Sequence, residues 1–361
     1  MSKEILKEEE VVAFQLRSLY KKYGYLPYKM SKFEEYDLYA KNKDFLGNSR
    51  IITFNDTDGK LLALKPDITL SIIKNDGDGG AKRKVYYHES IYRASKRTGG
   101  FRELQQSGIE CIGDIDGYDV FETVYLAAAS LAAISKDFIL DLSHLGIVTS
   151  ILKAACADKG FENEAKECLA EKNAHGLIAL CEEYGVSAEH KARAVALVGA
   201  YGKPDEVLER LKGICTDEEG KALSDLELLC SLLKKTEYAE NIRLDFSVVN
   251  NGKYYDDILF KGFVHGVGEG VLSGGRYDKL LARMGRKSGG IGFAVDLDLL
   301  EGLVKRPSEY DVDVLVLYDD HTSVAAVAET VRLIAADGSC VSAQKSTGGL
   351  RYKRLVDLRG E

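Results

Sequence analysis

Hydrophobic residues recur at helical spacing among charged residues at the start of the chain. The segment from residue 4 to residue 23 therefore predicts an amphipathic opening helix, which Gly24 would end. The apolar segments RIITF and LLALK flank the acidic stretch NDTDG, a pattern that predicts a β-hairpin. The next segment, DITLSIIKN, follows Pro66 and predicts a helix, because proline suits a helix start and an early carboxylate suits the helix dipole.

Two longer stretches, KVYYHESIYRA and FRELQQSGIECIG, are rich in aromatic and β-branched residues. This composition is typical of strands, and the glycine-containing loop SKRTGG between them predicts an antiparallel hairpin. A helix over residues 118–135 and a strand at FILDLSHLGI are expected next. Further strands are expected at IRLDFSVV, DDILFKGFV and GEGVLSGGRYD. The helix KLLARM should follow, and then GGIGFAVDLDLL, a strand that runs into a helix.

The composition changes between about residues 151 and 236, where alanine, leucine, glutamate and lysine dominate. This change predicts a helical insertion. Beyond Pro307 the pattern reads strand, helix, strand, and about fifty residues are fewer than the roughly 100 to 150 of a typical autonomous domain. We therefore expect an α+β protein with an antiparallel-dominated sheet flanked by helices. The expected parts are a core over 1–307, which contains the insertion, and a truncated α/β tail over 308–361.

The formal charge of the chain is −8, from 49 basic and 57 acidic residues. No general attraction to nucleic acid or to an anionic membrane is therefore expected. The sequence has no apolar run of about 18 residues, and its first ten residues are charged, unlike a signal peptide. The seven cysteines and six histidines are scattered. We expect reduced thiols, no metal site, no cofactor and a cytoplasmic protein.

Candidate chemistry is concentrated in four segments that follow one another along the chain. They are LKPDITL, the hairpin with IYR and FRELQQSGIECIG, YYDDILF, and LSGGRYDKLL with GGIGFAVDLDLL. Together they resemble the signature of histidyl-tRNA synthetases, whose segments are LRPEGT, the motif 2 arginine with an FxQxGxExxG strand, a histidine-pocket segment, and GGRYD with motif 3. The resemblance covers about residues 10 to 305. It implies the class II aminoacyl-tRNA synthetase fold, which normally works as a homodimer.

The residue types in these segments suit an amino-acid pocket. Gln106 and Glu110 lie four residues apart in a predicted strand, so their side chains share one face. A carboxylate can accept from an imidazole N–H, and tyrosines can supply hydroxyl contacts and apolar walls. The resemblance places Asp67 and Thr69 near the ammonium group of a histidine ligand. The predicted histidine-binding residues are Asp67, Thr69, Arg93, Gln106, Glu110, Tyr254, Tyr255 and Tyr277.

Simpler roles for the same residues stay open. Asp67 could serve only the start of its helix, and Gln106 and Glu110 could face solvent. With twenty tyrosines in the chain, a given tyrosine more often packs than binds a ligand. The glycines of HGVGEGVLSGG lack a following lysine-serine pair, which favours hairpin turns over a phosphate-binding loop.

The catalytic arginines of the resembled family are incomplete. Arg93 retains the motif 2 arginine, but Asn250 stands where a second arginine is expected, with Lys253 nearby. Leu299 stands where the motif 3 arginine would grip ATP, and Asp296 and Asp298 add negative charge. Losing one preorganised donor typically costs roughly a hundred- to a thousandfold in rate. We therefore expect no catalytic residues and no adenylation.

A synthetase-like core of this kind, followed by at most half of an anticodon-binding domain, resembles the regulatory subunit of ATP phosphoribosyltransferase. Asp67 and FILDLSHLGI also fit that family. The resemblance implies a non-enzymatic homodimer within a hetero-oligomer, expected to be a hetero-octamer, with short-form catalytic subunits. It implies activation of those subunits and histidine feedback inhibition in the first step of histidine biosynthesis, without tRNA or membrane partners. A diverged histidyl-tRNA synthetase and a stand-alone histidine sensor are the alternatives.

Overall fold

The chain divides into two compact units, Met1–Leu303 and Val304–Glu361, and each is described by itself. Among the residues that can be described, no helix is both long and apolar enough to cross a membrane. The structure is a computed structural model, and it describes residues 8–46, 50–75, 82–94, 100–249, 255–303 and 309–360.

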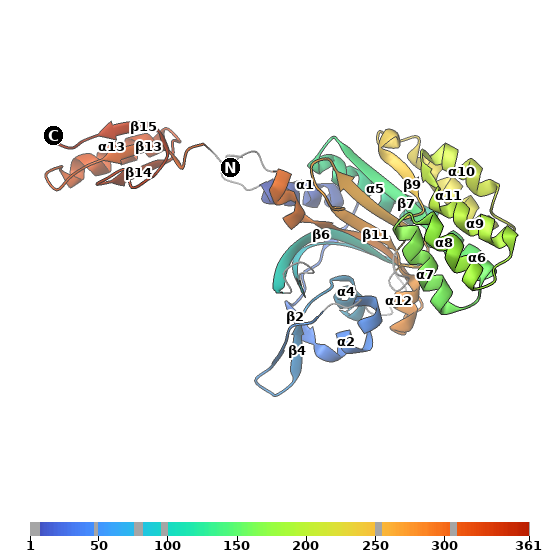
Figure 1. Ribbon diagram of the computed structural model, residues 1–361. Coiled ribbons are helices and arrows are strands. Elements are labelled where there is room, and N and C mark those ends of the chain that lie inside the picture. The colour runs from blue at the N-terminus through green and yellow to red at the C-terminus, as the bar shows by residue number, and fades with distance from the viewer. Residues whose placement is uncertain are drawn as a thin grey trace. The chain divides into compact units, whose positions relative to one another are not determined.

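Within the described part of the first unit, nine strands form a central sheet (Figure 1). Six of the neighbouring pairs are antiparallel and the two others are parallel, so the predicted antiparallel-dominated sheet is confirmed. From one edge to the other, the strands are β1 (Leu26–Pro27), β5 (Arg83–Ala94), β6 (Phe101–Gly113), β12 (Gly289–Asp296), β11 (Leu272–Arg276), β10 (Ile258–Val264), β7 (Phe138–His144), β9 (Ile242–Asp245) and β8 (Tyr201–Gly202).

The predicted hairpin of β5 and β6 is confirmed, and its register positions the candidate residues. Val85 pairs with Glu110, and Glu89 pairs with Gln106. Side chains alternate along a strand, so Gln106 and Glu110 share one face while Cys111 lies on the other. Residues 95–99 of the connecting loop SKRTGG lie outside the described residues.

The helices α1 (Glu8–Lys22) and α5 (Gly117–Ile134) cover one face of this sheet (Figure 1). Both were predicted, and α5 begins with a capping box in which Asp116 accepts from the backbone N–H of Asp119. Their apolar side chains pack with Ile109 and Phe293 of the sheet in one large core. Such burial is worth about 25 cal/mol per Å² of apolar surface, which explains why these helices form here.

The other face of the sheet meets α4 (Thr69–Asn75), α12 (Asp278–Arg283) and a small second sheet (Figure 1). Helix α4 begins at Thr69, slightly later than predicted, because the Asp67 carboxylate accepts from the backbone N–H of Leu70 and so caps the helix. The predicted hairpin of RIITF and LLALK is confirmed within the small sheet. The elements on this side are β2 (Phe33–Glu35), α2 (Tyr36–Lys41), α3 (Lys43–Leu46), β3 (Thr53–Asn55) and β4 (Leu61–Leu64).

A group of helices follows β7, as the composition predicted (Figure 1). The prediction of a strand over all of FILDLSHLGI was wrong in its last three residues. β7 ends at His144 and α6 begins at Leu145, because Leu145, Val148 and Leu152 are buried at helical spacing. The helices are α6 (Leu145–Ala155), α7 (Lys159–Ala170), α8 (Ala174–Glu183), α9 (Ala188–Val198), α10 (Pro204–Lys212) and α11 (Gly220–Leu233), followed by the 3-10 turn η1 (Ala239–Asn241).

The second unit contains the predicted strand, helix and strand, which are β13 (Val312–Leu317), α13 (Val324–Ala336) and β14 (Val341–Gln344). A further strand, β15 (Tyr352–Asp357), pairs with β13 in parallel. Half of its sequence YKRLVD is charged, its apolar residues do not alternate with polar ones, and its side chains are largely exposed, so the pattern gave no strand signal.

Candidate functional site

A cavity of about 240 Å³ lies on the sheet face that meets α4. It is smaller than the roughly 300 to 1,000 Å³ of sites for drug-sized ligands, so it suits a smaller molecule. Seven of the eight predicted ligand residues line it, and Tyr254 lies outside the described residues. We call it the first cavity. Its lining is Phe45, Leu46, Asp67, Ile68, Thr69, Tyr87, Arg93, Gln106, Glu110, Tyr255, Ser273, Tyr277, Gly292, Phe293, Ala294 and Asp296.

Glu110 is the central polar group of the first cavity and is only 2% exposed. The hydroxyl of Thr69 donates to Oε1 and the hydroxyl of Tyr277 donates to Oε2, each at 2.5 Å. Burial raises the pKa of Glu110 to about 8, although both hydrogen bonds oppose the rise. The carboxyl group is therefore mostly protonated near neutral pH, and a ligand that donates a hydrogen bond or carries positive charge would favour its ionised form.

Two glycines of β12 make room for this arrangement. A Cβ atom on Gly292 would lie 1.9 Å from Oε2 of Glu110 and 2.4 Å from the backbone oxygen of Ile109. A Cβ atom on Gly290 would lie 2.4 Å from the ring of Tyr277. The glycines in GGIGFAVD therefore allow Glu110 and Tyr277 to approach the sheet closely.

Asp67 and Arg93 form a second polar group in the first cavity. Arg93 donates from Nε to the backbone oxygen of Pro66 at 2.7 Å, and its Nη2 lies 3.6 Å from Oδ2 of Asp67. The other oxygen of Asp67 caps α4 through the N–H of Leu70, at 2.9 Å. The role of Asp67 at its helix start is therefore real, and the same side chain also lines the cavity.

Asp296 was not among the predicted ligand residues, but it lies opposite Gln106 in the pairing of β12 with β6. Gln106 Nε2 donates to Asp296 Oδ1 at 2.6 Å. Burial raises the pKa of Asp296, while this hydrogen bond and Arg93 lower it. A strand pairing of GGIGFAVD with FRELQQSGIECIG could have identified Asp296, because its position then follows from that of Gln106.

Tyrosines and apolar side chains close the remaining walls. Tyr255 and Tyr277 line the cavity as predicted, and Tyr87 does so without having been predicted. Phe293 lines it through its backbone, because its side chain packs in the large core on the other face of the sheet. Burial raises the pKa of Tyr255, and Glu110 adds to the rise, so its hydroxyl stays protonated. Arg93 is the one lysine or arginine in the described lining, against three carboxyl groups. The cavity can thus hold a small molecule that carries several donors and one acidic group.

The positions at which the family resemblance leads us to expect two further arginines are only partly described. Asn250 and Lys253 lie outside the described residues. Leu299 belongs to the 3-10 segment η2 (Leu297–Leu303) and packs against the large core. Its side chain offers no donor. In the described part of the chain, no three His, Cys, Asp or Glu side chains are grouped as they would be around a metal ion.

Comparison with known proteins gives related sequences and related folds. The histidyl-tRNA synthetase family model matches residues 2–300. A Ruminiclostridium cellulolyticum protein named ATP phosphoribosyltransferase regulatory subunit is 26% identical over 337 residues, which cover 88% of this chain and 79% of that protein. A crystal structure from Bacillus halodurans C, described as an ATP phosphoribosyltransferase regulatory subunit/histidyl-tRNA synthetase, matches with a TM-score of 0.77 at 23% identity, covering 98% of this chain and 94% of that one. A chain of an ATP phosphoribosyl transferase complex from Thermotoga maritima matches with a TM-score of 0.63 at 18% identity, covering 80% and 97%.

Proposed function

The chain belongs to the histidyl-tRNA synthetase family, and from this premise we propose that it is a non-catalytic regulatory subunit of ATP phosphoribosyltransferase that binds free histidine. The observation that carries the proposal is the first cavity, in which Asp67, Thr69, Gln106 and Glu110 come together around a space of amino-acid size. The name of the relative from Ruminiclostridium cellulolyticum supports the same role.

Histidine matches the first cavity group by group. Its carboxylate pairs with Arg93, the cation of the described lining. Its ammonium group lies near Asp67 and Thr69, and an imidazole N–H donates to Glu110. Tyr255 and Tyr277 flank the ring. Glu110 then loses its proton, because its ionised form accepts hydrogen bonds from the ligand as well as from Thr69 and Tyr277.

Adenylation is not part of the proposed function. Leu299 replaces a cation with an apolar side chain that is packed into the core, and Asn250 replaces another. Charge that develops on a phosphate would then lack two preorganised donors. The acid Asp296 in the lining further disfavours ATP.

Histidine acts as the allosteric ligand and the catalytic subunit as the protein partner. The chain works as a homodimer within a cytoplasmic hetero-oligomer, expected to be a hetero-octamer, that contains short-form catalytic subunits. It activates these subunits, and bound histidine inhibits them by favouring one arrangement of the assembly. A coupling free energy of about 1 to 3 kcal/mol is typical of such regulation. The net charge of −8 disfavours tRNA as a partner.

Two measurements on the purified chain test this proposal. Calorimetry should detect histidine binding, and histidine-dependent pyrophosphate exchange with ATP should be absent. Exchange at a rate above background would instead favour the diverged synthetase. Absence of histidine binding would show that the first cavity is not a histidine site.

A further inference from the structure

A second cavity, of about 120 Å³, lies where the helical insertion meets the ends of the sheet. One wall is formed by Leu228, Leu229 and Leu232 of α11, and the opposite wall by the first turn of α5. This cavity shares no lining residue with the first cavity. Its volume suits a single side chain more than a metabolite.

The two helices that line the second cavity also carry exposed and half-buried apolar side chains. Leu228 is 54% exposed, and Tyr118, which follows the lining residue Gly117, is 60% exposed. The ring of Tyr118 lies 6.5 Å from that of Phe121, which lies 6.0 Å from that of Tyr125. We call these four residues and the second cavity the α5–α11 surface. Tyrosines beside a small apolar recess are typical of the energetically dominant part of a protein interface.

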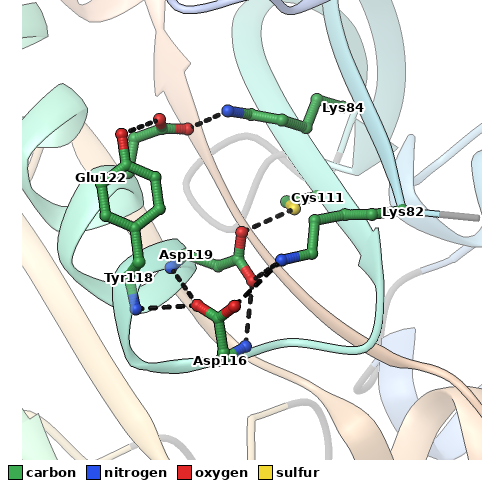
Figure 2. Close-up of polar contacts among 7 residues, drawn as sticks. All are labelled: Lys82, Lys84, Cys111, Asp116, Tyr118, Asp119 and Glu122. Atoms are coloured by element: carbon green, nitrogen blue, oxygen red, sulfur yellow. Dashed lines mark hydrogen bonds and ion pairs between the residues drawn. The ribbon is translucent and has the colours of Figure 1, made fainter.

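Tyr118 is held in place by a charged network beneath it (Figure 2). Its hydroxyl donates to Glu122 at 2.9 Å, and Glu122 forms an ion pair with Lys84. Lys82 pairs with Asp119 at 2.5 Å and with Asp116 at 3.2 Å. The hydroxyl contact with Glu122 on the same helix holds the ring in place, so little side-chain entropy would be lost when a partner covers it.

The charges around the second cavity indicate what it accommodates. Three carboxylates line it, from Asp116, Asp225 and Asp257, and the single lining guanidinium is that of Arg276. Arg276 is already paired with Asp278 at 2.8 Å and lies 3.7 Å from Asp257. Asp225 is exposed and forms no ion pair with any described residue. The charge in the lining that is left without an ion pair is therefore negative.

His144 contacts one of these carboxylates. Its Nε2 lies 2.8 Å from a carboxylate oxygen of Asp257, which can only accept, so this nitrogen carries the proton. Its Nδ1 is buried and has no hydrogen-bond partner among the described residues. Leucines on one side and acceptors on the other suit a long cationic side chain, whose apolar stem and charged head need different surroundings.

We propose that the α5–α11 surface is a docking site for a protein partner and that the second cavity receives an arginine side chain of that partner. A second copy docked with Asp225 near the two-fold axis would place this carboxylate and its acidic neighbours beside the same acids, which is unfavourable. A different protein with a basic surface is the better match. This inference rests on the proposed function, in which the partner is the catalytic subunit of ATP phosphoribosyltransferase.

Interferometry with the purified catalytic subunit tests the docking site through two variants. Asp225→Lys reverses the free charge, and Leu228→Glu disrupts the apolar wall. Each should weaken binding about tenfold or more, as expected for central interface positions. The matched controls are Glu183→Lys at the exposed end of α8 and Leu333→Glu in α13, where Leu333 is 55% exposed. Both controls should bind within about twofold of the unmodified chain.

The outcomes separate this inference from the proposed function. If the unmodified chain binds the catalytic subunit and both test variants bind equally well, the docking site is wrong while the proposed function stands. If the unmodified chain does not bind, both fail. Sedimentation of the chain alone tests whether a second copy occupies the surface. If Leu228→Glu changes self-association and leaves partner binding intact, a second copy is the occupant and the inference is overturned.

Competition with n-butylguanidinium tests the identity of the bound side chain. The small cation should weaken binding of the catalytic subunit to the unmodified chain, and n-butanol, which has the same stem without the charge, should not. Absence of competition by n-butylguanidinium, or equal competition by n-butanol, would contradict an arginine in the second cavity. Histidine calorimetry on Asp225→Lys and Leu228→Glu should match the unmodified chain, which shows that both variants are folded.

Discussion

The first and second cavities both have acidic linings, yet they differ in how their charges are arranged. In the first cavity, Glu110 is 2% exposed and receives two hydrogen bonds from side chains of the protein. In the second, Asp225 is exposed, and leucines form much of the wall. The first cavity suits a small polar molecule, whose proposed binding would displace a proton. The second is a recess within the surface that we propose binds a protein.

Under the proposed roles, one fold separates ligand binding from partner binding. The strands β6 and β12 carry the first cavity on one face of the sheet, whereas α5 and α11 carry the second. Substitutions in one cavity should therefore leave the function of the other intact. Substitutions in each cavity test whether the two functions are separate.

Replacing Glu110 with alanine should have the largest effect. The change removes the carboxylate that accepts from the ligand and leaves the hydroxyls of Thr69 and Tyr277 without their acceptor. Hydrogen bonds to charged groups contribute about 1.5 to 3 kcal/mol, so histidine affinity should fall about a hundredfold. Calorimetry measures this loss. Binding of the catalytic subunit by Glu110→Ala should be unchanged, and a loss of both activities would contradict the separation.

Gly292→Ala should destabilise the protein. The added Cβ would meet the carboxylate of Glu110 at 1.9 Å and the Ile109 backbone oxygen at 2.4 Å, and the backbone of β6 cannot yield easily. Overpacking of this kind costs about 1 to 3 kcal/mol, which urea unfolding would measure. Gly268→Ala is the matched control, because no atom lies within 4 Å of its added Cβ. Equal stability of both variants would argue against this packing.

The pH dependence of histidine binding should be the next largest effect. The pKa of Glu110 is about 8 in the unliganded protein, so below that pH the group is mostly protonated. Histidine favours the ionised form, and binding therefore releases a proton. Affinity should rise with pH between about 6.5 and 8, by at most about tenfold per pH unit. Calorimetry over this range should show a flat profile for Glu110→Gln, and an equal slope in that variant would assign the proton to another group.

Asp225→Lys should have the smallest effect on the first cavity. Asp225 lines only the second cavity and is exposed, so its reversal should change histidine affinity by less than about twofold. Calorimetry on this variant checks the expectation. A large loss of histidine affinity would show that the two cavities communicate within one chain.

The central fold could be predicted from the sequence because its strands and helices carry strong periodic patterns. The hairpin of β5 and β6, the helix α5 and the strands around GGRYD follow from apolar and aromatic spacing. The errors lie where apolar residues continue across a boundary, as at His144, or where a strand is half charged and does not alternate, as in β15. Periodicity does not report such cases, since it records burial and not backbone conformation.

The first cavity was predictable in its charged residues and less so in its walls. The positions of Gln106 and Glu110 follow from strand alternation, and Asp67 and Arg93 from the family resemblance. Tyr87, Phe293 and Asp296 depend on which strands pair and in which register, which a single sequence does not fix. The second cavity could not be predicted, because residues of α5, α11, β7 and β10 meet there only after folding.

The most direct test of the regulatory role is a phosphoribosyltransferase assay of the native catalytic subunit, with and without this chain and histidine. We predict that the chain raises the rate and that histidine then lowers it. The Glu110→Ala variant should raise the rate equally but should not respond to histidine. No effect of the unmodified chain on the rate, or full histidine inhibition with Glu110→Ala, would contradict the account.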